Sequence, residues 1–249
     1  MKQDLELIRM SDIQPEQVQW LWYPYIPLGK LTVIQGDPGE GKTTFVLAVI
    51  AALTKGEALP EREPLDRVNI LYQTAEDGLA DTIRPRLDAL GADCSRVLVI
   101  DESKRELSLS DERIRQAMEE TGAKLLVLDP LQAYLGAEVD MHRANEVRPI
   151  LKRLGAVAEQ MGCAVILIRH LNKMQGQKSG HRGMGSVDFQ AAARSVLLVG
   201  RTKEDPQLRI VVPDKSSLAP EGESIAFALD PEQGFQWKGY CAYNAEELL

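Results

Sequence analysis

The hydrophobic positions of this chain form short runs that alternate with longer segments of helical periodicity. The runs predict strands at residues 31–34, 68–74, 97–100, 125–128 and 164–168. Between them, spaced apolar positions predict helices at 45–53, 79–90, 110–121 and 143–161. Pro85 interrupts the second of these helices, and Ser110 or Asp111 caps the third. This order predicts an α/β fold with a largely parallel, twisted sheet flanked by helices.

The pattern changes near residue 195, where apolar runs follow one another with turn signals between them. These runs, at 195–200, 208–212, 224–229 and 234–238, predict short antiparallel strands on the C-terminal side. Because 249 residues can enclose one full core and no clear linker interrupts the sequence, we expect a single domain over 1–249. It would comprise an arm or linker at 1–28, a core at 29–200 and a β extension at 201–249.

The loop after the first strand matches the phosphate-binding pattern G-x-x-x-x-G-K-[ST]. It consists of Gly36, Asp37, Pro38, Gly39, Glu40, Gly41, Lys42, Thr43 and Thr44. The glycines let backbone N–H groups converge on an anion, and the following helix directs its positive end at the same point. Lys42 would reach the β- and γ-phosphates, and the Thr43 hydroxyl would bind Mg²⁺. A strand before the loop and a helix after it are the required context, so we expect the chain to bind ATP with Mg²⁺.

Two acidic residues at strand ends are candidates for the rest of this site. Asp129 ends the fourth apolar run, where an aspartate would hold Mg²⁺ directly or through water, unless it only caps a turn. Pro130 follows it, so the base for hydrolysis must come from elsewhere. Glu76, just past the second strand, would reach the attacking water if that strand lay beside the phosphate-loop strand. Alternatively, Glu76 and Asp77 only begin a helix, whose dipole favours acidic residues; Asp77 is the second candidate for the base.

Composition and charge narrow the class of protein. No apolar run approaches the roughly 20 residues that cross a bilayer, and the first residues lack a signal pattern, so we expect a cytoplasmic protein without membrane contact. The cysteines at 94, 163 and 241 have neither a disulfide framework nor metal-ligand spacing. A net charge of −8 argues against a surface that binds polyanions everywhere, but leaves room for a local basic groove.

The phosphate loop, the turn at 74–77, the strand-end aspartate and the segment 168–173 together resemble the RecA-type ATPase core. The chain is most similar to hexameric helicases of the DnaB and plasmid RepA kind, over about residues 20–237. This resemblance implies a RecA-like fold and a nucleotide bound between adjacent subunits of a homo-oligomeric ring such as a hexamer. It also implies ATP turnover coupled to movement on single-stranded DNA.

The resemblance assigns roles to residues near the fifth strand. His170 takes the place of a polar sensor that contacts the γ-phosphate, unless it is an ordinary strand-end histidine. Residues 171–187 match the DNA-binding loop of these helicases. The stretch 169–182 has four basic residues and no acidic one, as contacts with a phosphate backbone require, although it could be a solvated basic loop. The expected DNA contacts are Lys173, Lys178 and Arg182.

One position departs from the family pattern. Lys215 matches the lysine of a Lys-x-Arg pair that points at the γ-phosphate of the neighbouring subunit, but Ser217 replaces the arginine. Three interpretations remain open: Lys215 acts alone in trans, Arg209 or Arg201 substitutes for the missing arginine, or the protein hydrolyses ATP slowly. Alternatively, Lys215 is an ordinary exposed lysine. Arg86 would stack on adenine, unless it is a helix-surface arginine.

An aromatic cluster precedes the first predicted strand: Trp20, Trp22, Tyr23 and Tyr25. It either packs on the edge of its own sheet or covers a neighbouring subunit. Taken together, these patterns favour an Mg²⁺-dependent ATPase that forms a ring and acts on single-stranded DNA in replication or repair. A nucleotide-gated oligomer that regulates a partner protein is the second hypothesis. A small-molecule phosphotransferase is the third, disfavoured because no arginine-rich lid is evident.

Overall fold

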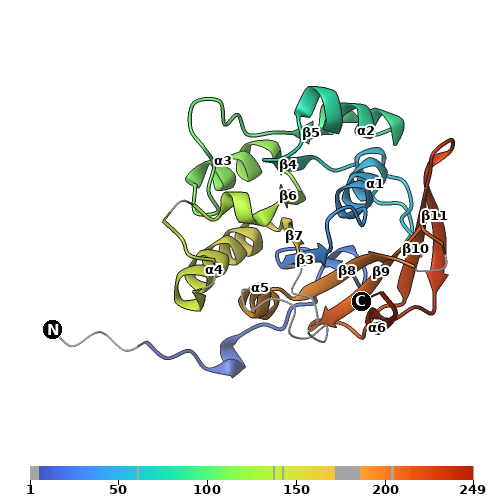
Figure 1. Ribbon diagram of the computed structural model, residues 1–249. Coiled ribbons are helices and arrows are strands. Elements are labelled where there is room, and N and C mark those ends of the chain that lie inside the picture. Colours follow the sequence, from blue (N-terminus) through green and yellow to red (C-terminus); the bar gives the residue numbers. More distant parts are fainter. Residues whose placement is uncertain are drawn as a thin grey trace.

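The computed structural model of the protein describes residues 6–60, 62–136, 138–141, 143–171, 186–202 and 205–248. Its centre is a sheet with the strand order β11-β10-β9-β8-β3-β7-β6-β4-β5 (Figure 1). The strands are β3 (Leu31–Gly36), β4 (Ile70–Thr74), β5 (Val97–Leu98), β6 (Leu125–Asp129), β7 (Ala164–His170), β8 (Ser195–Arg201), β9 (Leu208–Ser216), β10 (Ser224–Asp230) and β11 (Gly234–Cys241). Along the sheet, the neighbouring strands β8-β3-β7-β6-β4-β5 pair in parallel, and the neighbouring strands β8-β9-β10-β11 pair antiparallel. The predicted fold class is therefore confirmed.

Helices cover both faces of this sheet. The helices are α1 (Lys42–Lys55), α2 (Arg84–Ala89), α3 (Glu112–Thr121), α4 (Ala144–Met161), α5 (Ser186–Ala192) and α6 (Ala245–Leu248), with a π turn η2 (Leu79–Ile83) and 3₁₀ turns η1 (Met10–Asp12), η3 (Cys94–Arg96) and η4 (Leu131–Tyr134). Successive residues of a strand point to opposite faces. Ile34 and Ile166 therefore pack with α1 and α2 in one core, whereas Val33 and Val165 pack with α3, α4 and α5 in the other. Among the described residues, no helix has the length and apolar character that crossing a membrane needs.

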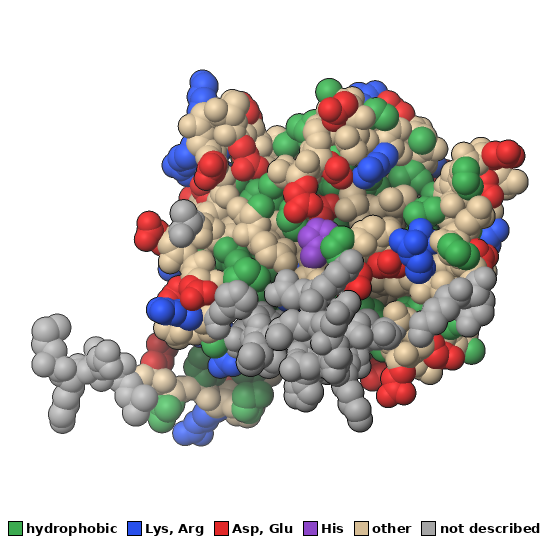
Figure 2. All heavy atoms as spheres, viewed as in Figure 1, with side chains coloured by type: hydrophobic (Ala, Val, Ile, Leu, Met, Phe, Trp, Pro, Cys, Tyr) green, Lys and Arg blue, Asp and Glu red, His purple; other side chains and the backbone are tan. Residues whose placement is uncertain are grey.

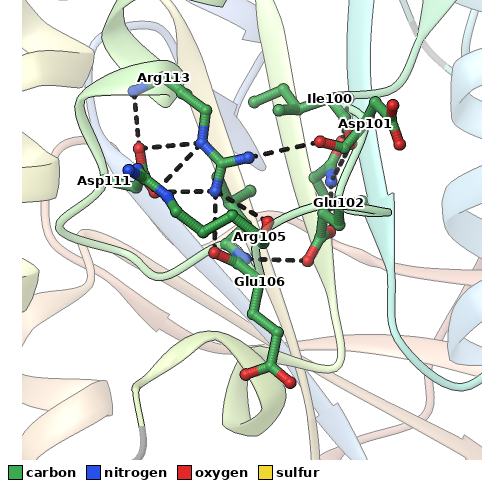
Figure 3. A network of polar contacts seen from close by, with 9 residues as sticks. Ile100, Asp101, Glu102, Arg105, Glu106, Asp111 and Arg113 are labelled. Carbon is green, nitrogen blue, oxygen red and sulfur yellow. Dashed lines mark hydrogen bonds and ion pairs between the residues drawn. The ribbon is translucent and has the colours of Figure 1, made fainter.

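The helix ends settle which residue caps α3 and show how Pro85 interrupts the predicted helix at 79–90. Asp111, rather than Ser110, caps α3, because its side chain accepts a hydrogen bond from the backbone N–H of Arg113. Figure 3 shows the same carboxylate between the guanidinium groups of Arg105 and Arg113. Pro85 divides the predicted helix at 79–90 into η2 and α2, and it lies in the first turn of α2, where its missing N–H needs no partner.

The order of the strands differs from one expectation. β6 and β7 lie between β4 and β3, so the second strand does not neighbour the phosphate-loop strand. Hydrophobic periodicity identifies a strand but carries no information about its neighbours. Here the chain crosses from β3 to β4 and later inserts β6 and β7 into the space between them.

The aromatic segment before β3 packs on its own domain. It forms the short strands β1 (Trp20–Trp22) and β2 (Ile26–Pro27), which pair antiparallel. Trp22 and Tyr25 are buried; Trp22 lies 6.2 Å from Phe45 of α1 and 6.0 Å from Trp237 of the edge strand β11, between ring centroids. The indole N–H of Trp22 donates to the Pro60 carbonyl. Of the two interpretations, packing at the edge of its own sheet is therefore correct for these two side chains.

Candidate functional site

The phosphate loop connects β3 to α1 and has a backbone that only glycine accommodates. Gly39 and Gly41 have φ values of +79° and +92°, in the region that side chains rarely adopt. A Cβ on Gly36 would lie 2.1 Å from the carbonyl oxygen of Val199 in β8. The three glycines of the motif thus serve two purposes: two allow the turn, and one allows close packing of β3 on its neighbour.

Lys42 lies inside this loop. Its ammonium donates to the carbonyls of Gly36, at 2.9 Å, and Asp37, at 2.8 Å. Only 3% of the residue is exposed. Burial lowers the pKa of Lys42, and the nearby carboxylates of Asp129, Asp37 and Glu40 act in the opposite direction. The loop therefore holds a cation at the N-terminal end of α1, where phosphates bind in this type of loop.

Thr43 and Asp129 meet as expected for a magnesium site. The Thr43 hydroxyl donates to Oδ2 of Asp129 at 2.7 Å, and the buried Tyr72 hydroxyl donates to the same oxygen at 3.1 Å. Burial raises the pKa of Asp129, while these two hydrogen bonds oppose that effect. A hydroxyl and a carboxylate are the hard oxygen ligands that Mg²⁺ prefers, so the residues present fit this ion.

Tyr72 was not a candidate at the level of sequence. It lies in β4 among apolar residues, and a phenol buried in such a strand normally finds a hydrogen-bond partner. The sequence alone could therefore predict that the Tyr72 hydroxyl has a hydrogen-bond partner, but not that the partner is Asp129 at the end of β6. Burial and the adjacent carboxylate raise the pKa of Tyr72, so its hydroxyl remains a proton donor at neutral pH.

Glu76 and His170 face each other across the end of β6. Nε2 of His170 lies 3.5 Å from Oε2 of Glu76, and the two side chains are 33% and 63% exposed. His170 pairs in register with Gly36 at the start of the phosphate loop. The sequence analysis expected Glu76 to reach the site if β4 lay next to β3, and that arrangement is wrong. The side chain of Glu76 nevertheless reaches His170 of β7, and β7 does lie next to β3. On the face shown in Figure 2, a histidine side chain reaches the surface beside acidic ones.

Arg86 borders the same site. A pocket of about 270 Å³ is lined by Lys42, Thr43, Thr44, Arg86 and His170, together with loop glycines and Leu229. The guanidinium of Arg86 lies 3.2 Å from the carboxylate of Asp77, the second candidate for the base. Asp77 thus forms an ion pair with Arg86, whereas Glu76 is the carboxylate that faces His170.

The candidates for a residue acting in trans all contact their own chain. The Lys215 ammonium donates to the carbonyls of Gln190 and Ala193 at the end of α5, at 2.7 and 2.9 Å, and burial lowers its pKa. Arg201 lies 3.1 Å from the carboxylate of Glu40 in the phosphate loop. Arg209 is buried and donates to a nearby carbonyl. Lys215 is therefore not an ordinary exposed lysine in this structure, and a role in trans stays a prediction.

The predicted DNA contacts Lys173, Lys178 and Arg182 lie outside the described residues. Arg169, the fourth basic residue of that stretch, is buried, and its guanidinium carbon lies 5.2 Å from the ring centroid of Phe189 in α5. Burial lowers the pKa of Arg169 to about 10. Counting Arg169 toward a basic surface was therefore wrong.

Comparisons with curated proteins find DNA repair proteins named RadA among the relatives of this chain. DNA repair protein RadA of Halalkalibacterium halodurans is 28% identical over 154 residues, which are 61% of this chain and 30% of RadA. RadA of Escherichia coli is 27% identical over 210 residues, or 84% of this chain and 40% of RadA. RadA of Helicobacter pylori is 26% identical over 237 residues, or 92% and 46%. The chain thus spans less than half the length of these relatives.

A structural comparison and a family comparison both agree with the observed fold. A solved KaiC-like protein from Pyrococcus horikoshii OT3 superposes with a TM-score of 0.62 over 90% of this chain and 98% of the other, at 17% identity, which shows a shared fold. The model of the AAA domain family matches residues 2–176. The finer resemblance to DnaB and RepA helicases remains a prediction. The chain belongs to the AAA domain family, and its core is that of a RecA-like phosphate-loop ATPase.

Proposed function

We propose that the protein is an Mg²⁺-dependent ATPase of the RecA-like helicase class that assembles into a ring and moves on single-stranded DNA. One observation carries the ATPase part of this proposal. The ends of four strands bring Lys42, the Thr43–Asp129 pair and the Glu76–His170 pair together around one loop. These are a phosphate-binding cation, a pair of magnesium ligands and a carboxylate next to a sensor.

Each of these residues has a role in hydrolysis. Lys42 neutralises the β- and γ-phosphates as negative charge moves toward the leaving oxygen. Thr43 and Asp129 would hold Mg²⁺, which supplies further charge neutralisation at the phosphates. Glu76 orients the attacking water and accepts its proton, and His170 contacts the γ-phosphate. When that phosphate leaves, His170, the last residue of β7, loses a partner, and the change passes directly to the segment that follows it.

The test of the catalytic assignment is Glu76→Gln, with Asp77→Asn as the matched control. An amide keeps the size of Glu76 but cannot take a proton, so turnover should fall by about 10²–10⁴-fold, while the affinity for a fluorescent ATP analogue stays within a factor of about two. Asp77→Asn should retain most of the turnover, because Asp77 is paired with Arg86. Equal turnover in wild type and Glu76→Gln would remove Glu76 from the mechanism.

The name of the relatives, DNA repair protein RadA, supports DNA as the partner and repair as the pathway. ATP hydrolysis should rise with single-stranded DNA, and the rise should fade with salt because phosphate contacts release counterions. A Lys178→Ala/Arg182→Ala variant should lose the stimulation and keep its basal rate. ATP turnover that does not change with DNA would favour a nucleotide-gated regulator instead. Slow hydrolysis by such a regulator would follow from the missing arginine of the Lys-x-Arg pair and from the hydrogen bonds that Lys215 makes within its own chain.

A further inference from the structure

The phosphate loop carries a carboxylate close to the point where phosphates bind. Glu40 directly precedes Gly41, the N-cap of α1, and its charge is close enough to act on the pKa of Lys42. The Glu40 side chain is only 16% exposed. A largely buried carboxylate beside a site for a polyanion weakens binding by like-charge repulsion unless a cation compensates it. The partner of Glu40 therefore bears on nucleotide binding.

That partner is Arg201, the last residue of β8. Its backbone N–H donates to Oε2 of Glu40 at 2.8 Å, and its Nε lies 3.1 and 3.2 Å from the two carboxylate oxygens. The same guanidinium donates through Nη2 to the carbonyl of Gly39 at 3.1 Å. Strand β8 brings Arg201 to the loop because it pairs in parallel with β3, whose last residue begins the loop (Figure 1). One side chain thus holds both a charge and a backbone group of the phosphate loop.

The bond to Gly39 fixes the direction of one peptide group. In a trans peptide, the C=O of one residue and the N–H of the next point in opposite directions. Because the Gly39 carbonyl points at Arg201, the N–H of Glu40 points away from Arg201 and into the loop. There it makes a long hydrogen bond of 3.4 Å to the Asp37 carbonyl, which also accepts from the Lys42 ammonium. The Glu40 N–H and the ammonium therefore converge on one point, as donors that bind an anion do.

Arg201 and Lys42 hold the loop backbone from different sides. Lys42 donates to the carbonyls of Gly36 and Asp37 from inside the loop, and bound phosphates would compete for its ammonium. Arg201 donates to Gly39 from β8, outside the loop, so its bonds can persist when a nucleotide is present. A glycine turn has much conformational freedom to lose, and a contact that removes this freedom beforehand favours binding.

Glu40 also stabilises the strand pair that carries Arg201. Arg201 pairs in register with Arg209 of β9, and like charges directly opposite on antiparallel strands repel each other. Burial and the charge of Arg201 lower the pKa of Arg209, whereas the Glu40 carboxylate acts in the opposite direction. The carboxylate therefore offsets this repulsion at the same time as it holds Arg201 on the loop.

We propose that Arg201 is a positioning residue for the nucleotide site of its own chain. Anchored by Glu40, it keeps the Gly39–Glu40 peptide turned so that its N–H faces the phosphates, and it neutralises the carboxylate beside them. This role is in cis, in contrast to an arginine that acts on the γ-phosphate of a neighbouring subunit, and it concerns nucleotide affinity rather than the chemical step. The proposal rests on the nucleotide binding of the proposed function, but not on hydrolysis, ring assembly or DNA.

Titration of a fluorescent ATP analogue with Mg²⁺, together with steady-state kinetics, separates affinity from chemistry. Arg201→Ala should raise Kd and KM by about tenfold, because charge-assisted hydrogen bonds are lost and the Glu40 charge is left uncompensated. Its kcat should stay within a factor of about two. Arg201→Lys should lie between Arg201→Ala and the wild type, since an ammonium lacks the fork that reaches carboxylate and carbonyl together. Arg115→Ala removes an arginine that pairs with Glu112 and Glu119 on α3, and this matched control should bind as the wild type does.

Glu40→Gln tests whether Arg201 acts through the carboxylate. Alone, it should not weaken binding, because the amide oxygen accepts from the same N–H groups. Combined with Arg201→Ala, it removes the uncompensated charge, so the double variant should bind the analogue about threefold or more tightly than Arg201→Ala. In the nucleotide-free protein, amide hydrogen exchange over residues 36–44 should be faster in Arg201→Ala than in the wild type.

Three results would overturn the proposal. They are a wild-type Kd in Arg201→Ala, no rescue by Glu40→Gln, or a kcat that falls more than about tenfold at unchanged Kd, as for an arginine acting in the transition state. Melting curves show whether each variant folds, and Arg201→Lys carries the comparison if Arg201→Ala does not. Absent turnover with the expected changes in Kd would remove the proposed hydrolysis and leave the role of Arg201. Normal turnover with an unaffected Kd would remove that role alone.

Discussion

Tyr72→Phe removes one hydroxyl from the base of the candidate site and leaves the shape of the core intact. In the wild type, the Tyr72 hydroxyl and the Thr43 hydroxyl donate to the same oxygen of Asp129. The substitution leaves that buried carboxylate with one donor from the pair. Because both the ring and its surroundings are retained, the effect should come from the lost hydrogen bond rather than from a cavity.

The expected magnitude follows from the burial and charge of the partners. A hydrogen bond to a charged group contributes about 1.5–3 kcal/mol, and we expect the lower end because Thr43 still donates to the carboxylate. For a chain of this size, a loss of about 1.5 kcal/mol lowers the melting temperature by roughly 3–6 °C. The freed carboxylate is also oriented less firmly, so the Mg²⁺ concentration needed for ATP binding should rise by about tenfold, the low end for partners of metal ligands.

Tyr25→Phe is the matched control. Tyr25 is as buried as Tyr72, and its hydroxyl donates to the carbonyl of Glu223 at 2.8 Å. Glu223 belongs to neither the phosphate loop nor the magnesium site but lies just before β10. The control should lose about 0.5–1.5 kcal/mol and keep the wild-type Mg²⁺ dependence. Thermal unfolding and titration of a fluorescent ATP analogue against Mg²⁺ measure the two effects. If both variants show the same Mg²⁺ dependence, Tyr72 does not orient Asp129 and the reasoning fails.

Three further predictions concern other contacts. Gly36→Ala places a Cβ 2.1 Å from the carbonyl oxygen of Val199, so the variant should lose about 3 kcal/mol of stability, as for other severe steric changes, and its melting temperature should fall by roughly 6–12 °C. An unchanged melting curve would contradict the close packing. Hydrogen bonds from Arg113 and Arg105 lower the pKa of Asp111 in the folded protein. The ionised Asp111 therefore stabilises the fold fully above its unfolded pKa near 3.8, and this stabilisation is lost as the pH falls through the lower folded pKa. Asp111→Asn should be less stable than the wild type at pH 7, and the difference in stability between the two proteins should shrink below about pH 4. Lys215→Met should cost about 1–2 kcal/mol by releasing the end of α5, and an unchanged melting temperature would exclude that anchoring.

The sequence predicted the parts of the site whose geometry is local. The phosphate loop is one continuous motif between a strand and a helix, and Asp129 ends a strand whose neighbours place it above that loop. What it could not predict depends on the order of the strands. Glu76 reaches His170 across β6, an arrangement that follows from the insertion of two strands between β3 and β4. The Tyr72–Asp129 bond has the same origin, since β4 and β6 pair side by side.

Arg169 and His170 show that some of the missed structure was nevertheless available from the alternation of strand side chains. Ile166 and Ile168 pack in the core under α1, and Leu167 packs in the core under α4 and α5. The same alternation continues to the end of β7, so His170 points to the phosphate-loop side, and Arg169 points to the opposite face against α5. Counting charges along 169–182 treats adjacent residues as one surface, which a strand does not allow. The predicted strand ended at residue 168, whereas β7 continues to His170. With the strand extended by those two residues, the period of two would have removed Arg169 from the basic stretch and kept His170 in the site.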